Sequence, residues 1–388
     1  MTLKKWNCSV LCGLLVLASV ANAEEFVVGV QLPLTGSMAR TGLGVQQGLT
    51  VAAELFNKNG GKYTIKLVTI DDETQPPKGI AAVEKLAAEG AVAITGGYGS
   101  QIVGPASEAA EKAGLVYLTS GSADERMSRR GFKGFFRING NADVYPKALA
   151  QLITEQGLTS ISLMYSTKKA TTDLANDLTK LLGSKVKVTL QAFDSATTDY
   201  KPLITKIKLQ DKPDAIVMSA YESDYIGILR AAKVVKPAVK AMIGAWVLVT
   251  PKMVTEFPDL MNNVYGTASL TYPSSYTSAE GKSFHEAYKK LYSSDPDYTG
   301  HNGYVQGTLL FKAIARAADK GTLRQKNGLA EELRAVPVET LSGPLKFDEF
   351  GDNILFRESM GQFQNGKIQV VSPKERATAK MVFPAVPW

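Results

Sequence analysis

Hydrophobic and polar positions follow two alternating rhythms along the chain. The run 26–32 is apolar and β-rich, and apolar residues between Val45 and Phe56 then recur at the spacing of one helix face. We expect that helix to stop at Asn59-Gly60-Gly61, because glycine accepts the left-handed conformation found at helix ends. Residues 63–70 follow as a second β-rich run. This segment therefore predicts a βαβ unit.

The same alternation continues beyond this unit. The expected strands are 91–95, 115–119, 160–165, 186–192, 215–219 and 240–245, and the expected helices are 105–113, 144–155, 171–182, 199–208 and 223–235. Pro105 is expected in the first turn of its helix. Residues 139–143 interrupt the rhythm and indicate a linker. Regular alternation predicts an α/β fold with two doubly wound parallel-sheet lobes, each with helices on both faces of its sheet.

The first 23 residues have the pattern of an export signal. Two lysines precede the apolar run 10–20, and Ala21-Asn22-Ala23 supplies small residues for cleavage after Ala23. A membrane anchor is the alternative, but the run is shorter than the roughly 20 residues that a bilayer span requires. Cys8 and Cys12 both lie in this segment. A processed chain would therefore have neither disulfide nor thiol chemistry.

The charge of the chain is modestly positive. The formal net charge is +7, and removal of the leader with its two lysines lowers it by two. The densest basic and aromatic cluster, 129–137, could indicate nucleic acid contact or a turn that leads into a strand. Basic residues elsewhere are interspersed with acids, as on any solvated surface. We favour the turn, and no nucleic acid partner is predicted.

Enzymatic interpretations have little support in the sequence. Glycines before the first helix mimic a dinucleotide fingerprint, but nine residues separate the strand from Gly42. Residues 166–169 match S-x-x-K without the partner motifs that the pattern needs. His285 and His301 lack a neighbouring nucleophile motif and metal-ligand spacing, and we expect them at the surface or at a lobe edge. We therefore predict no catalytic residue, no cofactor and no metal site.

Short motifs occur in a fixed order through the chain. They are Leu34-Thr35-Gly36, Ala52-Ala53, Asn57, Gly60-Gly61, Asp71-Asp72, Pro76-Pro77, Pro105-Ala106-Ser107, Arg130-Gly131, Phe136-Arg137, Gly227-Ile228-Leu229-Arg230 and Gly343-Pro344-Leu345. Their order and spacing resemble the type I periplasmic binding proteins, specifically the receptors of branched-chain amino acid ABC transporters. The resemblance covers essentially the whole chain after the leader.

The resemblance implies a chain that crosses between two lobes three times, near Asn141, Tyr272 and Gly351. The implied divisions are a signal peptide at 1–23, an N-lobe at 24–140 and 273–350, and a C-lobe at 141–272 and 351–388. Three connecting segments would form a hinge, so that the lobes close on a ligand in the cleft between them.

Two strand ends carry candidate ligand contacts. The loops 96–100 and 119–122 can direct backbone N–H groups and serine hydroxyls at a small anion. The alternative is an ordinary strand-to-helix turn with serine as the N-cap. The resemblance implies that a ligand carboxylate is held at Ser100, Gly121 and Ala123, so that the second hydroxyl is either displaced to Ser122 or lost.

The C-lobe positions depart from the pattern of the amino acid receptors. A tyrosine is kept at Tyr221, a second one is replaced by Ala170, and the acid that usually receives the ligand ammonium is replaced by Trp246. We therefore favour a carboxylate ligand whose apolar or aromatic body stacks on Trp246 and Tyr98. Amino acids stay open as an alternative if Glu222 or Asp224 points inward.

The resemblance implies a periplasmic solute receptor for a small-molecule ligand. It would be a monomer that binds branched-chain or hydrophobic amino acids, or aromatic or other organic acids, and delivers them to an inner-membrane ABC permease and its ATPase. A ligand-sensing module that docks on a membrane signalling protein is the first alternative. An exported enzyme is the least favoured one.

Overall fold

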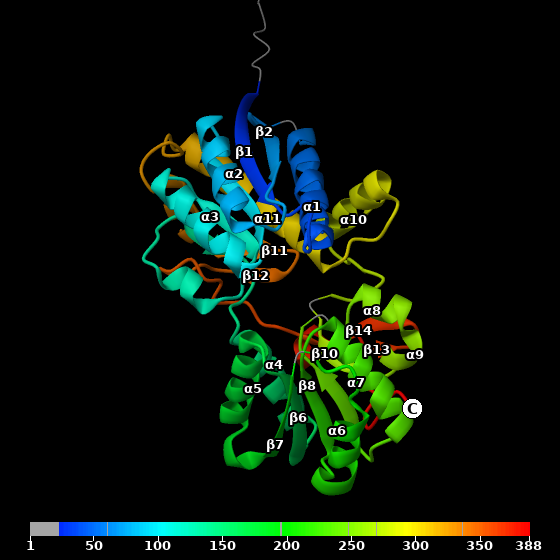
Figure 1. Ribbon diagram of the computed structural model, residues 1–388. Coiled ribbons are helices and arrows are strands. Elements are labelled where there is room, and N and C mark those ends of the chain that lie inside the picture. The colour runs from blue at the N-terminus through cyan, green and yellow to red at the C-terminus, as the bar shows by residue number, and fades with distance from the viewer. Residues whose placement is uncertain (1–22, 60, 195, 247, 269, 336) are drawn as a thin grey trace, which may run out of the picture.

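The computed structural model describes residues 23–388 except 60, 195, 247, 269 and 336. Residues 1–22 lie outside the described residues, so the signal peptide stays a prediction. Two α/β lobes are stacked end to end and joined by extended segments (Figure 1). The predicted α/β fold with two parallel-sheet lobes is confirmed. In the described part of the chain, no helix is both long and apolar enough to cross a membrane.

The N-lobe is built on a five-stranded parallel sheet with the order β2-β1-β3-β4-β5. Its strands are β1 Glu24–Leu32, β2 Tyr63–Asp71, β3 Ala93–Tyr98, β4 Tyr117–Gly121 and β5 Phe135–Arg137. β1 is central and pairs in parallel with β2 and β3, with Val28 opposite both Leu67 and Ala93. Its inner residues are almost all apolar, as is usual for a strand that is covered on both faces.

Helices cover both faces of this sheet. They are α1 Ala39–Lys58, α2 Pro76–Ala88, α3 Ser100–Lys112, η1 Glu125–Arg129, α10 Ala279–Tyr292, α11 Tyr298–Asp319 and α12 Gly328–Arg334, followed by the hairpin β11 Val338–Thr340 and β12 Gly343–Leu345. α1 packs on α11, and α2 packs on α3. Each pair encloses its own apolar cluster, one around Val51 and Phe311 and the other around Val83 and Val103.

The C-lobe is built on a seven-stranded sheet with the order β14-β13-β10-β9-β8-β6-β7. Its strands are β6 Ser160–Ser166, β7 Lys187–Phe193, β8 Ala215–Ser219, β9 Ala241–Gly244, β10 Tyr265–Thr267, β13 Met360–Gln364 and β14 Lys367–Ser372. The strands from β6 to β10 are parallel, whereas β13 and β14 add an antiparallel pair at one edge. The prediction of a parallel sheet is therefore correct for the strands from β6 to β10. It does not hold for β13 and β14, which are contributed by the last segment of the chain.

The C-lobe helices and short turns cover both faces of this sheet. They are α4 Val144–Glu155, α5 Lys169–Leu182, η2 Gly183–Lys185, α6 Lys201–Lys206, η3 Ile207–Asp211, α7 Glu222–Val235, α8 Pro251–Glu256, α9 Pro258–Met261 and η4 Lys374–Arg376. α4 and α5 enclose a cluster around Leu149 and Leu178, whereas α6 and α7 enclose another around Ile204 and Ile228. Each lobe therefore has a core on both sides of its sheet.

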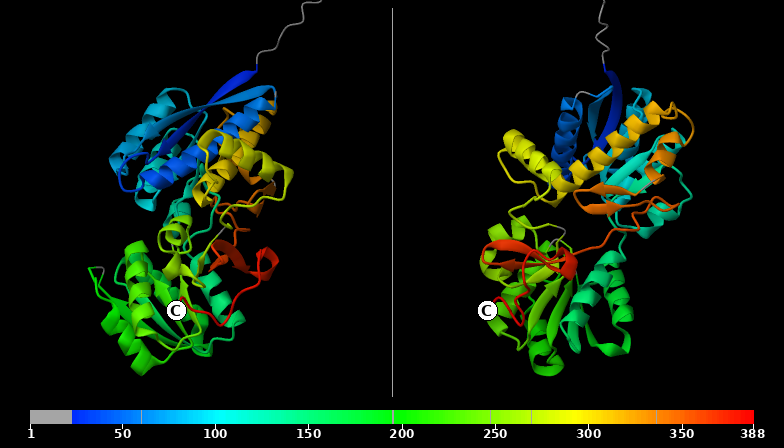
Figure 2. Two further views of the ribbon diagram at one scale, coloured as in Figure 1. Left: turned by 90° about the vertical axis from the view of Figure 1, so that its right-hand side faces the viewer. Right: turned by 180° about the vertical axis from the view of Figure 1, so that it is seen from behind.

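The chain passes between the two sheets after β5, after β10, and between β12 and β13. The last passage brings the chain back onto the C-lobe, where the C-terminus lies (Figure 2). The predicted lobe boundaries stay a prediction, although residues 141, 272 and 351 each lie in one of these connections. The basic cluster 129–137 leads into β5, as the turn interpretation predicted.

One predicted helix start is wrong. The helix expected to begin at Pro105 is α3, which begins five residues earlier, so that Pro105 lies inside it. Gly99 has φ +85°, a conformation that lets the strand turn directly into the helix. The turn at Gly99, and not the preference of proline for the first turn of a helix, therefore sets the start of α3.

Candidate ligand-binding cleft

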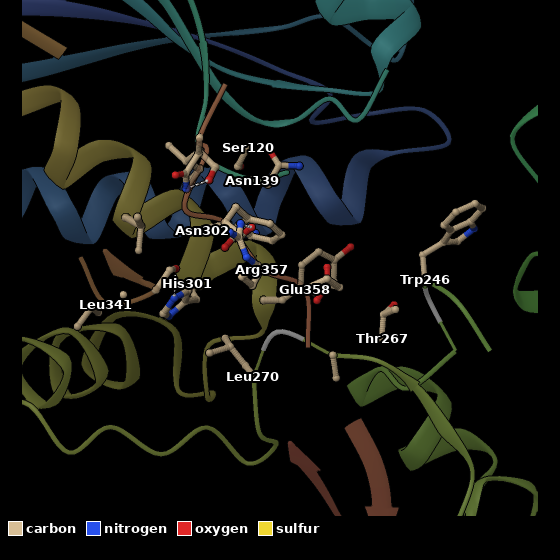
Figure 3. A pocket seen from close by; sticks show the side chains of 18 of the residues that line it. Ser120, Asn139, Trp246, Thr267, Leu270, His301, Asn302, Leu341, Arg357 and Glu358 are labelled. Carbon is tan, nitrogen blue, oxygen red and sulfur yellow. Dashed lines mark hydrogen bonds between the residues drawn. The ribbon is translucent and has the colours of Figure 1, made fainter. Parts of the chain in front are cut away.

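A cleft of about 630 Å³ lies between the lobes. It is lined by residues that follow β3 and β4 of the N-lobe and β9 and β10 of the C-lobe, together with parts of all three connections. In Figure 3, Trp246 and Thr267 lie at one end, His301 and Leu341 lie at the other, and Glu358 lies between them. The carboxyl ends of parallel strands are where α/β folds place their ligands.

The predicted contacts divide into two groups. The cleft lining includes Tyr98, Ser100, Gly121 and Trp246. Ser122 is not part of the lining, because it is fully buried behind Ser100, with the two hydroxyl oxygens 3.2 Å apart. Tyr221 is also not part of it, and the Lys168 ammonium lies 4.7 Å from the centre of its ring. Their roles as ligand contacts stay predictions.

Glycine positions keep the two N-lobe strand ends close together. A Cβ atom on Gly121 would lie 2.3 Å from the carbonyl oxygen of Gly97, so a larger residue would push the two loops apart. Ser100 does not act as the helix cap that the alternative predicted, because Gly99 is the N-cap and no side chain caps α3. The Ser100 hydroxyl instead accepts from the Asp124 backbone N–H at 3.3 Å. This arrangement places a hydroxyl and the positive end of a helix at the cleft.

Aromatic side chains from both lobes line the same cleft. Tyr98 and Tyr298 on the N-lobe have hydroxyl oxygens 3.2 Å apart. Tyr145 and Trp246 on the C-lobe form an edge-to-face pair with ring centres 5.4 Å apart and planes at 84°. Burial raises the pKa of Tyr98, Tyr145 and Tyr298, so all three stay neutral hydrogen-bonding groups. Flat apolar faces with hydroxyl groups suit an aromatic or apolar ligand body.

The two acids that could have received a ligand ammonium already have partners. Glu222 accepts from the Lys252 ammonium. Asp224 accepts from the Tyr200 hydroxyl at 2.8 Å and from the Tyr221 backbone N–H at 3.1 Å. Neither belongs to the cleft lining. The sequence left their role open, and the structure places both in contacts within the C-lobe.

Glu358 is an acid of the cleft that sequence reasoning missed. It lies in the third connection, lines the cleft, and accepts from the backbone N–H of Ser359 at 2.9 Å. Its charge is one cause of the raised pKa of Tyr145, after burial. Asp297 also lines the cleft, but it accepts from the backbone N–H groups of Thr299 and Gly300 at the start of α11.

The far end of the cleft is lined by polar side chains, among them His301 and Arg376. His301 is 2% exposed, and its ring nitrogens lie 3.1 Å from the Tyr276 hydroxyl and 2.9 Å from the Ser342 hydroxyl. Burial lowers its pKa to about 4, so it is neutral at pH 7. The expectation of a surface position is therefore wrong, although His301 does face the space between the lobes. Arg376 donates to the carbonyl oxygen of Arg357 and fixes the third connection beside it.

Two further residues of the cleft lining were not predicted, and they differ in whether the sequence carries a signal for them. Tyr145 directly follows the predicted linker, so an aromatic residue just past a crossing was an available signal. Tyr298 begins α11, and its approach to Tyr98 depends on how that helix packs across the N-lobe sheet. No local pattern in the sequence marks it.

The other catalytic and metal patterns have structural roles. Ser166 of the S-x-x-K pattern is buried, and its hydroxyl lies 3.0 Å from that of Thr171. Lys169 of the same pattern pairs with Asp173 at 2.6 Å. Across the described ranges, no group of three or more histidine, cysteine, aspartate or glutamate residues is placed to hold a metal ion.

The family model "Periplasmic binding protein" matches residues 25–357. A Leu/Ile/Val-binding protein homolog of Brucella suis is 26% identical, over 94% of this chain and 95% of that protein. The leucine-, isoleucine-, valine-, threonine- and alanine-binding protein of Pseudomonas aeruginosa is 24% identical, over 85% of this chain and 87% of its own length. The chain belongs to the periplasmic binding protein family, and the predicted resemblance to its type I, branched-chain amino acid members is confirmed.

Solved structures show the same fold. The substrate-binding protein LivJ of Streptococcus pneumoniae, solved with isoleucine, has a TM-score of 0.74 at 21% identity, covering 90% of this chain and 100% of that one. A solute-binding protein of R. palustris, solved with benzoate, has a TM-score of 0.72 at 18% identity, covering 93% and 98%. Members of this family are solute-binding proteins of ABC transporters and not enzymes, and they are normally periplasmic.

Proposed function

We propose that this protein captures a small carboxylate with an aromatic or apolar body in the interlobe cleft and delivers it to an inner-membrane permease and its ATPase. It would do so in the periplasm as a monomer, after removal of residues 1–23. No cofactor takes part in this role. A ligand-sensing module on a membrane signalling protein stays the alternative, because the same cleft would serve both roles.

The observation that carries the proposal is the contrast between the two lobes at the cleft. The N-lobe presents the Ser100 hydroxyl beside a helix N-terminus, which suits a carboxylate. The C-lobe presents the Tyr145 and Trp246 rings, while Glu222 and Asp224 are engaged elsewhere. A ligand ammonium closed against these rings without a carboxylate partner would lose several kcal/mol. A carboxylate without an amino group avoids that loss.

A second candidate ligand class is favoured by Glu358. Its carboxylate lines the cleft at a position distinct from Trp246 and could accept from a ligand ammonium. A branched-chain or hydrophobic amino acid would then bind with its carboxylate at Ser100 and its ammonium at Glu358. The fold does not decide between the two classes, since one structural neighbour was solved with isoleucine and another with benzoate.

Ligand capture requires the lobes to move. We propose that the N-lobe, 24–140 and 273–350, and the C-lobe, 141–272 and 351–388, rotate about the three connections as rigid bodies. Tyr221 would contribute only when the lobes approach, whereas Ser122 would act through its contact with the Ser100 hydroxyl. Small-angle scattering should then give a smaller radius of gyration with bound ligand than without it.

Native mass spectrometry of the purified protein tests the proposal. A bound organic acid that lacks an amine supports the favoured ligand class, whereas a bound amino acid supports the Glu358 alternative. A protein that neither retains nor binds any small carboxylate would contradict the capture role. The neighbouring genes distinguish the transport role from the signalling role, because genes for a permease and an ATPase indicate transport, whereas a gene for a sensor kinase indicates signalling.

A further inference from the structure

Two polar side chains of the cleft are left without hydrogen bonds by the protein around them. Ser120 in β4 is only 6% exposed, and Asn139 follows β5, and both line the cleft. The Asn139 Oδ1 atom is buried and has no hydrogen-bond partner. Among the described residues, the Ser120 hydroxyl has no partner either. Buried polar groups in folded proteins are nearly always paired, so this pair is suited to a polar group from outside the chain.

The N-lobe sheet brings these two residues to the same place. β4 and β5 are parallel neighbours, and the Ile138 N–H donates to the carbonyl oxygen of Thr119 at 3.0 Å. Ser120 and Asn139 come directly after these two residues, and Figure 3 shows their side chains at the N-lobe side of the cleft. The Asn353 side-chain amide donates to the carbonyl oxygen of Ile138 at 2.8 Å and fixes the backbone before Asn139. The pair is therefore positioned before a ligand arrives, which lowers the entropy cost of binding.

The pair lies next to the proposed carboxylate position. Ser120 directly precedes Gly121, whose carbonyl oxygen accepts from the Gly99 N–H at 2.9 Å. That bond holds the loop of Ser100 beside the end of β4. A ligand carboxylate at Ser100 would therefore place its neighbouring carbon atom next to Ser120. The polar group that this pair binds is then a substituent close to the carboxylate and not one at the far end of the ligand.

The chemistry of the pair selects among possible substituents. Ser120 and Asn139 are both neutral, and each can donate and accept hydrogen bonds. A ligand hydroxyl also does both, so it can donate to one residue and accept from the other. An ammonium only donates, and it brings a charge that neither residue balances. A keto oxygen only accepts, so it would leave the Asn139 oxygen unpaired. A hydroxyl group is therefore the substituent that fits best.

We propose that Ser120 and Asn139 form a hydroxyl subsite, and that the ligand of the cleft is a 2-hydroxy acid with an apolar or aromatic body. The inference rests on the proposed function and defines its ligand class more closely. The hydroxyl stands on the carbon atom that carries the ammonium in an amino acid. The subsite therefore distinguishes a hydroxy acid both from the unsubstituted acid and from the amino acid with the same body.

Calorimetry with compounds that share one body tests this inference. The aromatic series is 3-phenylpropanoate, both enantiomers of 2-hydroxy-3-phenylpropanoate, and phenylalanine. The aliphatic series is 4-methylpentanoate, both enantiomers of 2-hydroxy-4-methylpentanoate, and leucine. In at least one series, we expect one enantiomer of the hydroxy acid to bind about tenfold more tightly than the unsubstituted acid, because its hydroxyl adds hydrogen bonds inside the cleft.

Two variants connect this preference to the pair. Ser120→Ala and Asn139→Ala should each lower the ratio of the two affinities, hydroxy acid over unsubstituted acid, by roughly threefold or more. The affinity for the unsubstituted acid should change little. Ser184→Ala on η2 and Asn176→Ala on α5 change exposed residues of the same types, and as controls they should keep the wild-type ratio. Variants of the pair that weaken both acids equally would show that these residues only shape the cleft, which overturns the inference.

The unsubstituted acids separate this inference from the proposed function. If they bind as tightly as the hydroxy acids, the hydroxyl subsite is overturned and the capture of a carboxylate stands. If the amino acids bind more tightly than either acid, the favoured ligand class and the subsite are both contradicted. If no compound of either series binds, the proposed capture of an apolar or aromatic carboxylate fails, and the subsite fails with it.

Discussion

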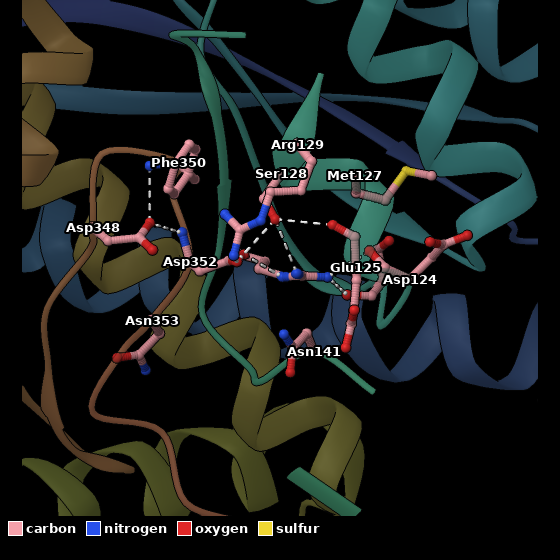
Figure 4. Close-up of polar contacts among 12 residues, drawn as sticks. Asp124, Glu125, Met127, Ser128, Arg129, Asn141, Asp348, Phe350, Asp352 and Asn353 are labelled. Carbon is pink, nitrogen blue, oxygen red and sulfur yellow. Dashed lines mark hydrogen bonds and ion pairs between the residues drawn. The ribbon is translucent and has the colours of Figure 1, made fainter. Parts of the chain in front are cut away.

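Arg137 at the end of β5 is fully buried, and its Nε donates to the Asp352 carboxylate of the third connection at 2.6 Å. The same guanidinium donates to the carbonyl oxygens of Ser122 and Asp124, at 3.3 and 2.9 Å, and to the Ser128 hydroxyl at 3.2 Å. Figure 4 shows this network around Ser128 and Asp352. One buried cation thus joins the loop behind Ser100 to the connection that leads to Glu358.

Asp352→Asn should destabilise the protein, because it leaves a buried guanidinium without its counter-charge. Removal of one partner of a buried pair typically costs roughly 3–5 kcal/mol, and the remaining carbonyl contacts of Arg137 favour the lower end of that range. Urea unfolding at pH 7 measures the loss. Asp173→Asn, which breaks an exposed pair with Lys169, is the control and should leave the midpoint nearly unchanged. An equal loss of stability in the two variants would contradict the prediction that the buried Arg137–Asp352 pair matters more to folding than an exposed pair.

Ser100→Ala should weaken ligand binding with little effect on folding. If the hydroxyl donates to a ligand oxygen, the variant loses about 1.5–3 kcal/mol, which is roughly a ten- to hundredfold loss of affinity. Calorimetry with the ligand that co-purifies measures this change in affinity. Ser184→Ala, at an exposed position of η2, is the control and should bind normally. Unchanged affinity in Ser100→Ala would limit Ser100 to its contact with the Asp124 backbone.

Trp246→Leu should lower the affinity for an aromatic acid more than Trp246→Phe does. The leucine variant loses the aromatic pair with Tyr145 and the stacking face, whereas phenylalanine keeps both in part. Aromatic contacts of this kind contribute about 0.5–1.5 kcal/mol, so we expect roughly a three- to tenfold difference between the two variants. Titration of both variants with 3-phenylpropanoate measures it. Identical affinities would place the ligand body away from Trp246.

His301 should make the protein sensitive to acid. Its folded-state pKa of about 4 lies below the unfolded value of about 6.5, so between these values the unfolded chain binds a proton that the folded chain excludes. Its contribution is fully present above about pH 6.5 and is lost as the pH falls toward 4, by up to roughly 3 kcal/mol. Urea unfolding from pH 7 to pH 4.5 should show a shallower loss for His301→Gln than for wild type. Ser184→Ala, at an exposed position of η2 that does not titrate, is the control and should keep the wild-type slope.

The sequence predicted the elements that obey local rules. Helix 144–155 and strand 215–219 agree with α4 and β8, because periodicity and chain punctuation define them locally. Strand ends also predicted the loops of Ser100 and Gly121 at one cleft, since carboxyl ends of parallel strands meet at one edge, whereas Trp246 was implied by the resemblance; all three line the cleft.

What the sequence did not predict depends on contacts between distant segments. Glu358 reaches the cleft only because the third connection returns beside the other two. His301 is buried because Tyr276 and Ser342, from separate segments, close around it. No local sequence pattern predicts these contacts between distant segments.

The most direct measurement is isothermal titration calorimetry of the mature protein with matched pairs of compounds. The pairs are 3-phenylpropanoate against phenylalanine and 4-methylpentanoate against leucine, which differ only by the α-amino group. We predict that the carboxylate of at least one pair binds, with its amino acid at least about tenfold weaker, because the Trp246 and Tyr145 rings offer a ligand ammonium no carboxylate partner. Binding of the amino acids alone would contradict this account and assign the ammonium to Glu358.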